Sequence, residues 1–117
     1  MLLNKNNAGL EAEKLAATFL AERGLKLVTQ NYHCRFGEID LIMKDAKTLV
    51  FIEVRLRSNS AFGSAAASIT PQKQQKMILT AQHYLRQHGQ SACRFDAILM
   101  SKADMQNIEW IRNAFET

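Results

Sequence analysis

Residues 49–52, with the sequence Leu-Val-Phe-Ile, limit the fold of this chain more than any other segment. Successive side chains of a strand point to opposite faces, so four apolar residues in a row need cover on both faces of a sheet. Residues 37–43 also have a strand-like pattern, and only the polar residues 44–47 separate the two segments. A connection this short joins antiparallel neighbours. We therefore expect strands over 37–43 and 48–56, the second one central in its sheet.

Capping signals place two helices around these strands. Asn7 precedes an apolar periodic segment that Gly24 ends, and Thr70 with Pro71 opens a second one that Gly89 ends. The connection through the second helix is long enough for a crossover, so the strands before and after it should be parallel. The expected elements are a helix over 8–23, a strand over 25–32, a polar turn over 31–36, a strand over 94–100, and a strand or short helix over 108–115.

The length indicates one domain, and the order of the expected elements makes it an α/β domain with a mixed sheet flanked by helices. The chain has 117 residues, of which 47% are hydrophobic, and its net charge of +4 is compatible with a polyanionic partner. Cys34 and Cys93 lie far apart without ligand-like spacing, so we expect no zinc site and a reducing, cytoplasmic location. No apolar run reaches the roughly 20 residues of a membrane span, so we expect no membrane partner.

Carboxylates interrupt both of the strands that the connection over residues 44–47 joins. Glu38 and Asp40 share one face of the first strand, whereas Glu53, Arg55 and Arg57 share one face of the second. Burying an unpaired carboxylate costs roughly several kcal/mol, so carboxylates that converge in a sheet need a role. Mg²⁺ binds about two carboxylates plus waters, and Asp40 and Glu53 on neighbouring strands could share one ion. The alternative is a solvated ion-pair network in which the arginines neutralise these carboxylates.

Four further charged positions stand out. Glu13 falls at the edge of the apolar stripe of the first helix, where an ordinary solvated charge is the alternative to a role in the site. Lys73 lies in the first turn of the second helix, where it could lend an amine to the site, meet a phosphate at the helix N-terminus, or face solvent. Arg94 and Asp96 are expected to form a structural pair.

Several motifs together carry a resemblance that covers nearly the whole chain. They are Gly9-x-x-x-Glu13, the run over residues 37–42, the run over 50–57, Phe62-Gly63, Lys73, and Arg94-Phe95-Asp96. In this combination they resemble the YraN family of small bacterial proteins, which is similar to Holliday-junction resolvases and the PD-(D/E)XK nuclease superfamily. The likeness implies a restriction-endonuclease-like core, in the order helix, three strands, helix, strand. It also implies Mg²⁺- or Mn²⁺-dependent cleavage of nucleic acid.

Site residues follow from this resemblance position by position. Asp40 and Glu53 match the metal-binding carboxylates, and Glu13 matches the helix glutamate that completes the site. Arg55 stands where the superfamily has lysine, so it keeps the charge and can grip a phosphate but cannot release a proton. The expected catalytic residues are thus Asp40, Glu53 and Arg55, the expected metal ligands are Glu13, Asp40 and Glu53, and the residues expected beside the metal or on the substrate are Glu38, Arg57 and Lys73.

The function that this likeness implies is a single resolvase-like nuclease domain over residues 1–117. It would be an endonuclease acting on DNA, branched DNA included, through attack of metal-activated water on a phosphodiester. Two alternatives stay open: a nucleic-acid-binding module that lost catalysis, motivated by Arg55, and a protein-interaction domain whose carboxylates form only salt bridges. Because resolvases of this kind work as dimers, a homodimer is a further expectation.

Overall fold

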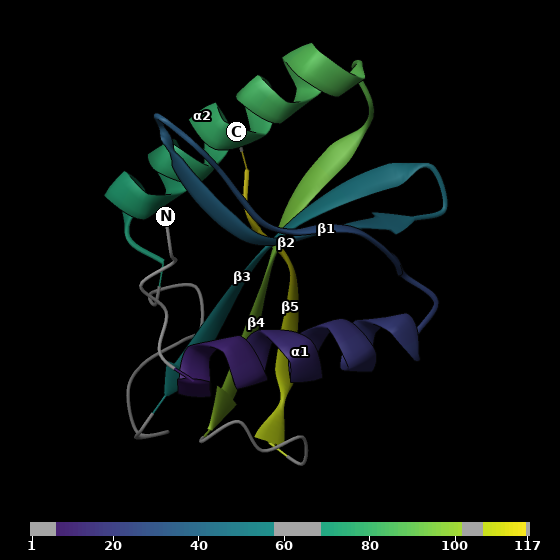
Figure 1. Ribbon diagram of the computed structural model, residues 1–117, viewed down its shortest axis with the longest axis vertical. Helices are drawn as coiled ribbons and strands as arrows, with labels where there is room; N and C mark the ends of the chain where they lie inside the picture. The colour runs from purple at the N-terminus through teal and green to yellow at the C-terminus, as the bar shows by residue number, and fades with distance from the viewer. Residues whose placement is uncertain (1–6, 58–68, 102–106, 117) are drawn as a thin grey trace.

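The computed structural model describes residues 7–57, 69–101 and 107–116 (Figure 1). Within these ranges the sheet has the order β1-β2-β3-β4-β5, and all neighbours are antiparallel except β3 and β4, which are parallel. The predicted mixed α/β sheet and its crossover are therefore confirmed, in an arrangement consistent with a restriction-endonuclease-like core. The elements are α1 (Asn7–Ala21), β1 (Lys26–Cys34), β2 (Gly37–Asp45), β3 (Thr48–Arg57), α2 (Pro71–His88), β4 (Cys93–Ser101) and β5 (Glu109–Phe115).

Strand β3 lies in the middle of the sheet, with α1 and α2 on opposite faces (Figure 1). Phe51 packs on the α2 side with Met77, whereas Val50 and Ile52 pack on the α1 side with Leu20. All five side chains are fully buried. The apolar run that predicted a strand covered on both sides thus divides into two cores.

The ends of the helices follow their capping residues. Thr70 Oγ1 accepts a hydrogen bond from the backbone N–H of Lys73 at 3.1 Å, and Pro71 occupies the first turn of α2. Gly24, with φ +98°, follows the end of α1. Its backbone N–H donates a hydrogen bond to the carbonyl of Ala21, and the N–H of Leu25 donates to the carbonyl of Leu20. These two hydrogen bonds are the pattern of a Schellman motif. Neither helix of the described chain is long and apolar enough to cross a membrane.

The prediction of a polar turn over residues 31–36 was wrong for residues 31–34, which belong to a strand. Strand β1 continues through Cys34, which pairs with Gly37, and the turn is confined to residues 35–36. Tyr32 explains the difference, because its ring packs edge-on against Tyr84 and its hydroxyl lies 2.6 Å from Nδ1 of His83. These contacts with α2, which is distant in the sequence, hold a polar segment in the sheet. The C-terminal segment, left open between strand and helix, is the strand β5.

Gly37, directly after the β1–β2 turn, should not tolerate a side chain. Its φ is +152°, and an added Cβ would lie 3.3 Å from Oγ1 of Thr80 and 3.4 Å from Cβ of Lys76 on α2. We expect Gly37→Ala to lower the free energy of unfolding by about 1–3 kcal/mol, as measured by urea denaturation.

Gly24→Ala is the matched control for this substitution. Gly24 also has a positive φ, but an added Cβ would meet nothing within 4 Å. The control should therefore lose only the backbone contribution, about 1 kcal/mol. Equal losses in the two variants would show that the turn does not press on α2.

Candidate active site

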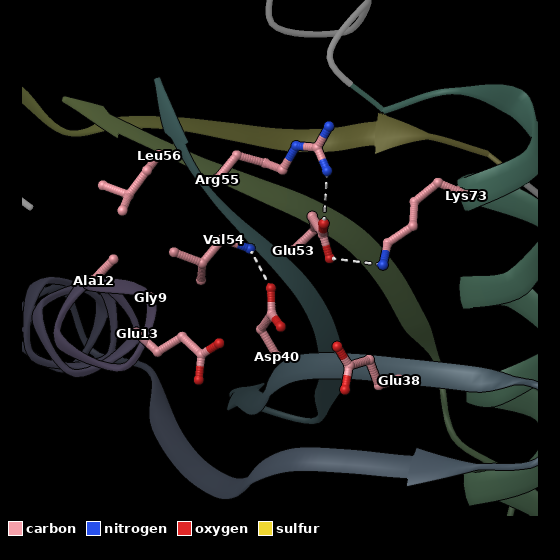
Figure 2. A pocket seen from close by; sticks show the side chains of 10 residues that line it. All are labelled: Gly9, Ala12, Glu13, Glu38, Asp40, Glu53, Val54, Arg55, Leu56 and Lys73. Atoms are coloured by element: carbon pink, nitrogen blue, oxygen red, sulfur yellow. Dashed lines mark hydrogen bonds and ion pairs between the residues drawn. The ribbon is translucent and has the colours of Figure 1, made fainter. Parts of the chain in front are cut away.

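The sheet opens at the point where the carboxylates were predicted. The ladder between β2 and β3 ends at the pair Leu41–Ile52, so Asp40 and Glu53 are the next residues along the two strands. Beyond the last pair, the backbone N–H of Val54 donates to Oδ2 of Asp40 at 2.9 Å instead of to a strand carbonyl. A pocket of about 480 Å³ lies here, bordered by α1, the two strands and the first turn of α2 (Figure 2).

This pocket gathers side chains that are far apart in the sequence. Three of its carboxylates are almost completely buried: Asp40 is 5% exposed, and Glu13 and Glu53 are each 4% exposed. Figure 2 shows Glu13 reaching from α1 toward Asp40, while Lys73 reaches from α2 toward Glu53. The predicted site residues that line the pocket are Glu13, Glu38, Asp40, Glu53, Arg55 and Lys73.

Two cations hold the carboxylate of Glu53. Nη1 of Arg55 lies 3.4 Å from Oε2, and Nζ of Lys73 lies 3.7 Å from Oε1 (Figure 2). The arginine contact matches the ion pair weighed from the sequence. The lysine contact corresponds to one of the roles considered for Lys73, an amine supplied to the site from the second helix. The Thr70 cap orients the turn that carries this lysine.

Burial and charge make Glu53 an unusual acid. Burial, with the negative charge of Asp40 beside it, raises the pKa of Glu53 from 4.5 to about 7, although Lys73 and Arg55 act in the opposite direction. A hydrogen bond between the carboxyl groups of Asp40 and Glu53 also favours the protonated form. Near neutral pH a large fraction of Glu53 is therefore protonated, and a bound cation would have to displace this proton.

The chemistry of the donors fits a hard divalent cation. The pocket presents carboxylate oxygens, which Mg²⁺ and Mn²⁺ prefer, and more negative than positive side chains. Oε1 of Glu53 is buried and accepts no hydrogen bond from the described residues. In the part of the chain that the structure describes, no three His, Cys, Asp or Glu side chains stand close enough to form a metal cluster. The acidic side chains would therefore have to rotate to close around an ion.

Some residues that line the pocket were not among the predicted site residues. Gly9 and Ala12 line the pocket from α1, and small residues there leave room between the helix and the strands. The spacing of Gly9 and Glu13 in the motif was the signal that could have pointed to this. Leu56 also lines the pocket, 39% exposed, and nothing in a strand sequence distinguishes such a leucine from a core residue. The side chain of Arg57 and the motif Phe62-Gly63 lie outside the described residues.

Comparison with known proteins places this chain among close relatives. Residues 12–100 match the family described as "Uncharacterised protein family UPF0102". A UPF0102 protein of Methylobacillus flagellatus is 58% identical over 107 residues, 92% of this chain and 95% of that protein. One from Nitrosomonas europaea is 57% identical over 111 residues, 94% of each chain. One from Psychromonas ingrahamii is 54% identical over 117 residues, 99% of this chain and 95% of that protein.

Proposed function

This chain belongs to the UPF0102 family, as its YraN-like motifs predicted, and we propose that its pocket is the active site of a metal-dependent nuclease acting on DNA. One observation carries the proposal. Asp40 and Glu53 are buried side by side where β2 and β3 separate, at the wall of a pocket that Glu13 enters from α1. Neighbouring buried carboxylates, one of them with a raised pKa, are unfavourable for stability alone, and they are typical of sites that carry out chemistry.

Asp40, Glu53 and Glu13 would hold Mg²⁺ or Mn²⁺. Such an ion neutralises charge on a phosphate oxygen and lowers the pKa of a water molecule. Arg55 lies at the mouth of the pocket with its side chain 41% exposed, so its guanidinium can donate two hydrogen bonds to a phosphate. Lys73 adds a second positive charge, from a rigid helix turn, next to the carboxylates. These two cations would orient a phosphodiester over the acidic residues.

The direct test is cleavage of branched and linear DNA by the purified protein with Mg²⁺ or Mn²⁺. Because each carboxylate would bind the ion, we expect Asp40→Asn and Glu53→Gln to lower the cleavage rate at least about a hundredfold. Asp45→Asn is the control, since Asp45 lies at the far end of the same strand and pairs with Arg94. Equal rates in the wild type and both site variants would rule out the catalytic assignment.

A second candidate function is nucleic-acid binding without cleavage. Both cations of the pocket are engaged with Glu53, and Arg55 cannot release a proton as a lysine could. This function predicts salt-sensitive DNA binding and no metal-dependent turnover in either the wild type or Arg55→Lys. Cleavage that appears only in Arg55→Lys would instead identify a nuclease site that lacks one proton-transfer group.

A further inference from the structure

The net positive charge of this chain comes from two segments that lie together in the fold. Residues 26–36 and 71–88 contain five Lys or Arg and no Asp or Glu, which leaves ten basic and eleven acidic residues in the rest of the chain. The two segments are β1 with its turn, and α2, and they pack against each other. The net charge of +4 therefore comes entirely from one contiguous region, not from an even scatter of lysines and arginines.

Aromatic rings lie within this basic region. Phe36 is half-buried in the β1–β2 turn, and the guanidinium of the exposed Arg35 lies 4.8 Å from the centre of its ring. His83 of α2 meets Phe36 edge-on, with ring centres 6.3 Å apart, and its Nδ1 is bonded to the hydroxyl of Tyr32. Arg86, one turn further along α2, is close enough to Tyr32 to influence the pKa of its hydroxyl, which burial raises. These contacts hold the rings in place.

The region also continues into the pocket. Cβ of Lys76 lies 3.4 Å from the position of a Cβ on Gly37, so this lysine borders the turn. Glu38 follows Gly37 directly and lines the pocket, and Lys73 lies in the pocket one turn before Lys76. Figure 1 shows the β1–β2 turn beside α2, on the face of the sheet opposite α1. A ligand that crosses the turn can therefore enter the pocket.

We propose that Arg35, Phe36, Lys76, His83 and Arg86, here called the aromatic–basic patch, bind an unpaired segment of the nucleic acid whose scissile phosphate enters the pocket. The proposal rests on the nuclease function above and adds the class of substrate, a strand with unpaired bases beside the cleavage position. Phosphates of the strand contact the side chains of Arg35, Lys76 and Arg86. A base stacks on Phe36 and on the guanidinium of Arg35. Stacking on a ring requires a base that is free of its duplex neighbours, whereas cations alone would bind any nucleic acid.

Binding without metal tests the patch separately from cleavage. Fluorescence anisotropy in EDTA compares a labelled single strand of about 16 nucleotides, a blunt duplex, and a duplex with a single-stranded tail. Phe36→Leu removes the ring but keeps an apolar side chain. We expect it to weaken binding of the single strand and the tailed duplex about five- to tenfold, and binding of the blunt duplex less than about twofold. Lys76→Gln should weaken binding of all three and lower the salt slope for the single strand by about 0.7.

Arg23→Gln is the matched control for Arg35→Gln. The guanidinium of Arg23 lies 3.5 Å from the centre of the Phe19 ring on α1, so the same type of pair and the same charge are removed from another part of the surface. Only Arg35→Gln should weaken binding. Equal losses in the two variants, or a Phe36→Leu protein that binds all three probes like the wild type, would overturn the patch.

The two proposals can fail separately. A wild-type protein that binds single strands through the patch but cleaves no DNA with Mg²⁺ or Mn²⁺ contradicts the nuclease function alone. A protein that cleaves blunt and tailed duplexes at the same rate, with no change in Phe36→Leu, contradicts the patch alone. Faster cleavage of the tailed duplex, reduced in Phe36→Leu to the rate of the blunt one, is the expected result.

Discussion

Replacing Asp96 by alanine should lower the free energy of unfolding by about 3–5 kcal/mol. Asp96 is completely buried, and Nε of Arg94 donates to both of its carboxylate oxygens, at 3.1 and 3.2 Å. Its oxygens also accept the indole N–H of Trp110 at 2.9 Å and the backbone N–H of Asn113 at 3.0 Å. Alanine would leave a cation and two N–H donors without this partner, between β4 and β5. The structural pair predicted for Arg94 and Asp96 is confirmed, and it extends to β5.

Asp45→Ala is the control for this prediction. Oδ2 of Asp45 accepts a hydrogen bond from Nη1 of the same Arg94 at 3.1 Å, but the Asp45 side chain is 36% exposed, so its loss should cost about 1 kcal/mol or less. Urea denaturation of the variants, with the slope compared as well as the midpoint, measures both losses. If Asp96→Ala cannot fold at all, the milder Asp96→Asn should still lose more than Asp45→Ala. Equal losses at the two positions would contradict the assigned role of Asp96.

The second large effect concerns Glu53 and pH. Its pKa of about 7 in the folded protein lies above 4.5, so the folded state binds the proton more tightly than the unfolded chain. Glu53 therefore contributes stability that is complete below about pH 4.5 and is lost as the pH rises through 7. The shift corresponds to about 3 kcal/mol across this window. Glu53→Gln removes the titrating group, so it should be more stable than the wild type at pH 8 by up to about this amount.

Urea denaturation in EDTA from pH 4 to 9 measures this effect in the absence of metal. The wild type should lose stability relative to Glu53→Gln as the pH rises, and the two curves should meet toward acid pH. Glu11→Gln, which removes an exposed carboxylate on α1, should follow the wild type. Parallel curves for the wild type and Glu53→Gln would mean that the pKa of Glu53 is the same in the folded and unfolded states, which contradicts the prediction.

Local signals were sufficient for most of the fold. Thr70, Pro71 and Gly89 mark the ends of α2 because a cap depends on a few neighbouring residues. The apolar run over 49–52 predicted a central strand because successive side chains point to opposite faces, so four residues are enough to show that both faces are apolar. The prediction of a turn over 31–36 failed because it used local signals alone. Strand β1 is extended by contacts between Tyr32 and residues about 50 positions later, which no local pattern contains.

The sequence by itself determined the order of the elements, the central position of β3 and which carboxylates share a face of a strand, because periodicity and caps are properties of short segments. Only the tertiary structure decided how those carboxylates meet. The ladder between β2 and β3 stops one pair before Asp40 and Glu53, and the packing of α2 brings Lys73 to Glu53. Both depend on contacts between segments far apart in the chain, and the burial and charge that raise the pKa of Glu53 arise only when these segments pack together.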